Sequence, residues 1–122
     1  LAIARAGGNH SLTTFEFDSF FLLLAVAGNE TTRNLISHGL LLLLEYPEVL
    51  ERVRRDRSLL PAVIEEMLRF RSPVIYMRRD ALADTELEGR RIRKGDKILM
   101  FYPSANRDEG IFDRPDEFRI DR

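Results

Sequence analysis

The hydrophobic residues between positions 14 and 46 recur with the period of an α-helix, and no proline interrupts them. Thr13 and Glu16 have the spacing of a capping box, which predicts that this helix begins just after Thr13. Pro47 predicts that it ends near Tyr46. At about 1.5 Å per residue the helix is about 48 Å long, whereas a compact chain of this size is only about 30 Å across. We therefore expect the helix to cross a domain larger than this chain.

Shorter periodic segments follow the long helix. The pattern predicts two further helices, at residues 47–55 and 59–70, and then extended segments at 74–81, 86–96 and 96–102. Pro73 marks the change from helical to alternating periodicity. Residues 1–12 carry no clear pattern, and the tail after Pro103 is predicted to be irregular. The predicted fold class is mainly α with a small β region, and residues 1–122 are expected to form part of a single domain.

The centre of the long helix contains residues that a helix interior disfavours. Gly28 costs about 1 kcal/mol relative to alanine, and a carboxylate such as Glu30 loses hydration between apolar turns. Ala27, Glu30 and Thr31 share one face because they lie three and four residues apart. Small residues there would admit a flat partner, beside which the carboxylate and the hydroxyl could relay protons. Alternatively, another helix crosses at this point and Glu30 forms a salt bridge elsewhere.

Two further pairs of charged residues allow more than one interpretation. Glu66 and Arg69 lie off the apolar stripe of their helix, so the default interpretation is a surface ion pair worth about 0.2–0.5 kcal/mol. If a larger protein covered that face, the pair would become a buried anchor. In the strand after Pro73, Arg78 or Arg79 could hold a carboxylate by its planar guanidinium group. Equally, their charges could protect the edge of a sheet.

The composition excludes several classes of protein. A net charge of -1 without long runs of one sign provides no basic surface for nucleic acid. The chain has no cysteine and two histidines, so disulfides, thiolate ligands and a histidine metal cluster are not expected, and no metal-ligating residue is assigned. The apolar runs are shorter than the roughly 20 residues of a membrane span, and no secretory signal is evident. We expect a cytoplasmic protein with no membrane partner.

Several short motifs follow one another along the chain: Ala27–Thr32, Glu66-x-x-Arg69, Arg79 with Ala81 and Asp84, Glu86-x-x-Gly89, Gly95-Asp96, Ala105–Asp108 and Phe112–Phe118. Their order over residues 12–122 resembles that of the cytochrome P-450 family, in its bacterial soluble branch. Each segment is short, and their shared order makes the resemblance specific. It implies part of the P-450 fold, with a long central helix on the distal side of the haem, two following helices and short antiparallel strands.

The resemblance implies a role for the face at the centre of the long helix. Ala27 and Gly28 match positions that leave room beside the haem for dioxygen and substrate. Thr31 matches the residue that hydrogen-bonds dioxygen. Glu30 matches the acid that helps to deliver protons for cleavage of the oxygen–oxygen bond. The catalytic pair is thus expected to be Glu30 and Thr31.

The resemblance also implies roles for residues outside that helix. Glu66 and Arg69 match a structural pair near the proximal side of the haem. Arg79 matches the residue that holds a haem propionate, and Arg78 is the weaker candidate. Val74 and Ile75 match a strand that borders the substrate pocket, as Ala27 does from the distal helix.

Two features depart from the family pattern. The iron-ligating cysteine is missing, so the chain is expected to be an internal fragment whose ligand lies beyond Arg122 and whose amino-terminal half is absent. Alone it should neither bind haem normally nor turn over. The third member of the structural network is also open, because Glu117 stands where many relatives carry arginine and Arg122 could substitute for it.

The expected parent protein is a monooxygenase that uses haem b and dioxygen. It would insert one oxygen atom into a C–H bond of a small apolar substrate, such as a lipid, terpene or steroid, with electrons from a ferredoxin-type donor. The alternatives are an inactive relative or a helical interaction module that keeps only the scaffold. A relative that uses peroxide is disfavoured, because such enzymes tend to replace the acid–alcohol pair, which is intact here.

Overall fold

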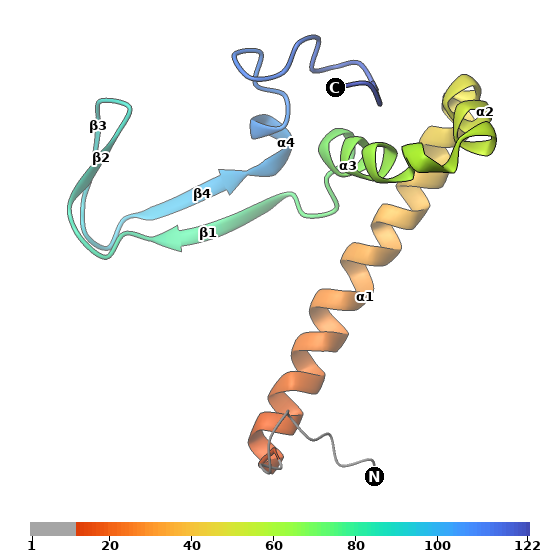
Figure 1. The fold of residues 1–122 in the computed structure, drawn as a ribbon. Helices are drawn as coiled ribbons and strands as arrows, with labels where there is room; N and C mark the ends of the chain where they lie inside the picture. The colour runs from red at the N-terminus through yellow and green to blue at the C-terminus, as the bar shows by residue number, and fades with distance from the viewer. Residues whose placement is uncertain (1–11) are drawn as a thin grey trace.

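The long helix predicted from the sequence is present. The computed structural model describes residues 12–122, and its first element is α1, Thr14–Glu45, with 32 residues. The Thr13 side chain accepts a hydrogen bond from the backbone N–H of Glu16, whose carboxylate accepts one from the N–H of Thr13. This capping box satisfies two free donors of the first turn. Figure 1 shows α1 as one continuous rod.

Two short helices pack against the carboxy-terminal end of α1. They are α2, Pro47–Arg55, and α3, Leu60–Phe70, joined by the single-turn helix η1, Arg57–Leu59. Asp56 caps η1 by accepting a hydrogen bond from the N–H of Ser58. The buried hydrophobic core contains Leu42, Val49, Val53, Val63, Met67, Phe118 and Ile120. Both predicted short helices are therefore confirmed, and the end of the chain returns to complete their core.

The extended region forms two separate two-stranded antiparallel sheets (Figure 1). Strand β1, Tyr76–Asp80, pairs with β4, Lys97–Phe101, and β2, Thr85–Leu87, pairs with β3, Arg90–Ile92. The small β region is thus confirmed. The predicted extension of the last strand to residue 102 is wrong, because the four-residue helix α4, Tyr102–Ala105, begins there. Proline is favourable in the first turn of a helix, which explains why Pro103 starts helical structure after ending the strand.

Most of α1 lies outside the small core. The helix extends beyond the other described elements (Figure 1), and large apolar side chains on it, including those of residues 20–24, are exposed. Only Gly39 and Leu42 of this helix are buried. An apolar helix surface of this size is what a helix inside a larger domain presents when it is viewed without its neighbours.

The crossing of α1 and α3 requires a residue without a side chain at position 39. A Cβ atom at Gly39 would lie 2.7 Å from the sulfur of Met67, which is buried. In the whole protein, the clash introduced by Gly39→Ala is therefore expected to lower the free energy of unfolding by about 1–3 kcal/mol. The higher helix propensity of alanine offsets about 1 kcal/mol of this loss. Denaturant unfolding of Gly39→Ala, with and without Met67→Val, measures this cost. No relief by the second substitution would contradict the proposed clash.

Candidate functional site

The centre of α1 presents an open face of small and polar residues. Ala27, Gly28 and Glu30 are exposed, so no other described helix packs across this face. A Cβ atom added at Gly28 would meet only a methyl group of Leu24, at 3.8 Å. The alternative in which another helix crosses at this point is therefore not realised among residues 12–122.

The acid and the alcohol on this face are both engaged within α1. The Thr31 hydroxyl donates a 2.6 Å hydrogen bond to the carbonyl oxygen of Ala27, one turn earlier. Both carboxylate oxygens of Glu30 accept hydrogen bonds from Nη2 of Arg33, at 2.6 and 2.7 Å. The sequence interpretation did not consider Arg33, although its spacing of three residues from Glu30 could have indicated the pair.

Glu66 and Arg69 form a second cluster, and the surface interpretation of this pair is wrong. Their side chains are only 4% and 7% exposed. Arg69 donates from Nε and Nη2 to the two carboxylate oxygens of Glu66, at 2.7 and 2.8 Å. The pair is buried because the carboxy-terminal segment, residues 106–122, folds over the face of α3 that carries it.

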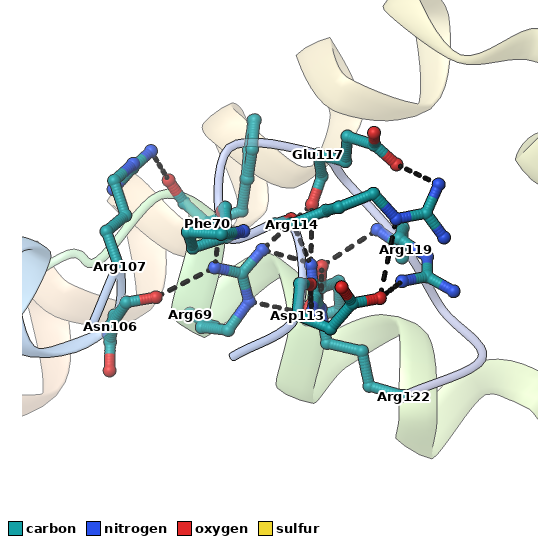
Figure 2. Close-up of polar contacts among 11 residues, drawn as sticks. Arg69, Phe70, Asn106, Arg107, Asp113, Arg114, Glu117, Arg119 and Arg122 are labelled. Carbon is teal, nitrogen blue, oxygen red and sulfur yellow. Dashed lines mark hydrogen bonds and ion pairs between the residues drawn. The ribbon is translucent and has the colours of Figure 1, made fainter. Parts of the chain in front are cut away.

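Arg69 also fixes the path of that segment. Its guanidinium donates to the backbone carbonyl oxygens of Asn106 and Pro115, each at 2.8 Å, and of Glu117, at 3.0 Å. Figure 2 shows the Arg69 side chain among these backbone groups. One buried cation therefore satisfies carbonyl groups at three points of a segment that has little secondary structure of its own.

Arg122, rather than the Glu117 side chain, is the third charged group of this cluster. Its Nε donates to Glu66 at 3.1 Å, and its other nitrogens donate to the carbonyl oxygens of Asp113, Arg114 and Glu117. Glu117 contributes only its backbone, because its carboxylate forms an ion pair with Arg114 (Figure 2). The question that the sequence left open is thus decided in favour of Arg122.

The charge of Glu66 depends on these donors. Burial by itself raises the pKa of the Glu66 carboxyl group. Hydrogen bonds from Arg69, from the backbone N–H of Arg119 and from Arg122 outweigh burial, so the pKa lies below the ordinary value of 4.5. The folded protein therefore binds this proton more weakly than the unfolded chain does.

This pKa difference predicts a loss of stability in acid. The stabilising contribution of Glu66 is fully present above the unfolded value of 4.5 and disappears as the pH falls through the lower folded pKa. Below pH 4.5 we therefore expect the stability of Glu66→Gln to depend less on pH than that of the wild type. Thermal unfolding of both proteins between neutral and acidic pH measures the difference, and parallel curves would contradict the assignment.

The residues predicted to border the substrate or hold the haem lie at the start of the β region. Val74 lines a cavity of about 230 Å³ with neighbours that include Leu68 and Met77, whereas Ile75 is exposed and lines another cavity. Arg79 is exposed and donates to the carbonyl oxygen of Arg78. No hydrogen bond or ion pair among residues 12–122 joins these residues to the face on α1.

Residues 12–122 contain no group of three or more histidine, cysteine, aspartate or glutamate side chains that could hold a metal ion. None of the described helices combines the length and the apolar character that a membrane crossing requires.

The fold is mainly helical with a few short antiparallel strands, and it carries the two side-chain clusters described above. The sequence profile of the family described as Cytochrome P450 matches residues 2–122, and the chain belongs to this family. The resemblance of the motifs to this family is therefore confirmed.

Similar proteins of known name or structure agree with this assignment. The chain is 50% identical over 112 residues to a methyl-branched lipid omega-hydroxylase of Mycobacterium tuberculosis, covering 91% of this chain and 26% of the relative. It is 45% identical over 119 residues to a steroid C26-monooxygenase of Rhodococcus jostii, a match that covers 98% of this chain and 25% of the relative. The structure of CYP109E1 from Bacillus megaterium in complex with testosterone matches with a TM-score of 0.86 and 42% identity. This match covers 98% of this chain and 33% of the CYP109E1 chain. The chain thus spans about a quarter of the length of these curated relatives.

The residues present fit one side of a haem group. The open face around Gly28 leaves space for a flat ring, and Arg79 has no ion-pair partner among residues 12–122, so its guanidinium can hold a carboxylate. The chain contains no cysteine to provide a thiolate for the iron. An open helix face and a guanidinium that can hold a carboxylate are therefore present among residues 12–122, whereas a cysteine that could ligate the iron is not among the 122 residues of the sequence.

Proposed function

We propose that this chain is part of the single catalytic domain of a haem-dependent monooxygenase. The observation that carries the proposal is the α1 face, where an exposed glycine lies beside a carboxylate and a hydroxyl. Haem b would supply the iron at which dioxygen is reduced. In the overall reaction a C–H bond becomes C–OH, the second oxygen atom leaves as water, and two electrons and two protons are consumed.

The side chains of α1 would position dioxygen and protons. Ala27 and Gly28 would let the ring and the substrate approach the helix backbone, because neither carries a side chain larger than methyl. The Thr31 hydroxyl, which now donates to Ala27, would turn to donate to dioxygen. Glu30 would take protons from water and pass them toward this hydroxyl.

The substrate is proposed to be a small apolar molecule of the lipid, terpene or steroid class. Two observations support this: the relatives include proteins named for a lipid and a steroid, and Val74 lies in a largely apolar cavity. Val74, Ile75 and Ala27 would contact this substrate. A ferredoxin-type protein would deliver the electrons, and the whole protein is proposed to be cytoplasmic.

The function can be tested on the whole protein, reduced and exposed to carbon monoxide. The absorption band of thiolate-ligated haem is expected. Incubation with isotopically labelled dioxygen, a lipid or steroid substrate, a ferredoxin and its reductase should then give product carrying one labelled oxygen atom. Absence of haem would favour the interaction module, and haem without product would favour the inactive relative. Product from hydrogen peroxide alone would favour the peroxide-using relative.

Arg79 is expected to contribute to retention of the cofactor. In Arg79→Gln the charge-assisted hydrogen bonds to a propionate would be lost, at a cost of about 1.5–3 kcal/mol, or roughly 10- to 160-fold faster haem loss. Transfer of haem to apomyoglobin measures this rate. Arg78→Gln is the matched control, because Arg78 is also exposed and pairs with Asp80 instead. Equal effects of the two substitutions would contradict the role of Arg79.

A further inference from the structure

A bidentate ion pair joins α2 to the end of the carboxy-terminal segment. Nη1 and Nη2 of Arg52 donate to Oδ2 and Oδ1 of Asp121, at 2.9 and 2.6 Å. The two residues are 69 positions apart, whereas every other exposed ion pair among residues 12–122 joins residues at most 9 positions apart. Local spacing therefore does not produce this contact, which forms only when the segment has closed over α3.

The residue after Asp121 belongs to the buried cluster of Glu66. Nε of Arg122 donates to Oε1 of Glu66 at 3.1 Å. The same oxygen accepts a hydrogen bond from the backbone N–H of Arg119 at 2.8 Å. The contact with Arg52 thus lies one residue away from a side chain that joins the carboxy-terminal segment to α3.

The pair is accessible to solvent, unlike the cluster beside it. The side chains of Arg52 and Asp121 are 45% and 62% exposed, whereas that of Glu66 is 4% exposed. The Arg52 guanidinium holds the pKa of the Asp121 carboxyl group below its ordinary value, so both groups are charged at neutral pH. Dissolved salt screens exposed charges, because the Debye length falls from about 30 Å at 0.01 M to about 3 Å at 1 M. Salt should therefore weaken the exposed pair more than the buried cluster.

We propose that Arg52 is a positioning residue that acts through Asp121 to keep Arg122 on Glu66, and that the Arg52–Asp121 pair is a salt-sensitive clasp for the carboxy-terminal segment. While the clasp is closed, the backbone at residue 121 is tied to α2, so the Arg122 side chain starts from a fixed point. When the clasp opens, the last residues of the segment move away from α3 more often, and Glu66 loses the donors Arg122 and Arg119. An exposed ion pair changes such an opening equilibrium by about 1.4- to 5-fold.

The test measures hydrogen exchange of the Arg119 backbone N–H in the whole protein, at about 0.01 M and about 1 M salt. At low salt Arg52→Gln should accelerate this exchange by about 1.4- to 5-fold relative to the wild type, and the difference should disappear at high salt. Asp121→Asn removes the same pair from the other side and should give the same result. Arg52→Lys keeps the cation and should restore part of the protection. Arg54→Gln is the matched control and should match the wild type, because Arg54 is exposed on the same helix and pairs with Glu51 within it.

A second substitution shows whether the clasp acts through Arg122. Arg122→Gln by itself should accelerate exchange at Arg119, because it removes a hydrogen bond to Glu66. Addition of Arg52→Gln to this variant should then have little further effect. If the two accelerations multiply instead, Arg52 does not act through Arg122, and the positioning role is overturned. The clasp is also overturned if Arg52→Gln exchanges at the rate of Arg54→Gln, or if its difference from the wild type persists at high salt.

Discussion

Replacement of Glu66 with alanine is expected to destabilise the protein by about 3–5 kcal/mol, the cost of removing one partner from a buried ion pair. The substitution leaves Arg69 buried without its carboxylate, and it removes the acceptor for Arg122 and for the backbone N–H of Arg119. The remaining carbonyl contacts of Arg69 cannot neutralise its charge. The largest loss of stability therefore belongs to a residue outside the proposed reaction.

The effect of Glu66→Ala can be measured on the whole protein and on the carboxy-terminal segment alone. Denaturant unfolding of Glu66→Ala reports the free energy, and limited proteolysis within residues 106–122 reports release of the segment that Arg69 holds. Glu65→Ala is the matched control, since Glu65 is the exposed neighbour on the same helix. Glu66→Gln keeps the shape of the side chain and should fall between the two. A Glu66→Ala protein as stable as Glu65→Ala would return the pair to the surface interpretation.

Replacement of Thr31 with alanine should uncouple electron use from product formation. Positioned proton transfer contributes about 10²- to 10⁴-fold to a reaction, so without the hydroxyl we expect product per dioxygen to fall by about tenfold or more. Dioxygen consumption should continue, because the electrons then produce hydrogen peroxide. Haem content should stay near normal, since the only side-chain hydrogen bond of Thr31 among the described residues is to Ala27 of its own helix.

Two controls make this prediction specific. Thr31→Ser retains a hydroxyl and should retain most of the coupling. Thr32→Ala removes an adjacent exposed hydroxyl that is not on the face of Ala27 and Glu30, so its coupling should match the wild type. Peroxide and product are measured in the same reaction. Unchanged coupling in Thr31→Ala would remove Thr31 from the catalytic pair.

The sequence anticipated the elements whose formation depends on near neighbours. The start of α1 follows from Thr13 and Glu16, which contact each other over one turn. The end of α1 follows from Pro47. The helical period of α3 places Val63 and Met67 on one side, and both pack in the core. The shared face of Ala27, Glu30 and Thr31 likewise follows from helix geometry alone.

The features that the sequence pattern did not predict correctly depend on the tertiary structure. The spacing of Glu66 and Arg69 is the same whether the pair is exposed or buried. The spacing by itself therefore favoured a surface pair, whereas the resemblance to the family implied a structural one. The start of α4 at Tyr102 was also missed, because Pro103 can end a strand or open a helix. In both cases the local signal was compatible with two environments.

The sequence by itself determined α1, α2 and α3 and the placement of an acid and an alcohol on one helix face, because these depend on residues up to about four positions apart. The alternating pattern also predicted the short strands, although their pairing, such as Tyr76 with Phe101, is a long-range contact. Only the tertiary structure decided that Glu66 and Arg69 are buried and that Arg122 joins them, through contacts that span 37 to 56 residues. Such contacts form when the carboxy-terminal segment closes over α3. No periodicity along the chain encodes that closure, since it depends on which surfaces become buried together.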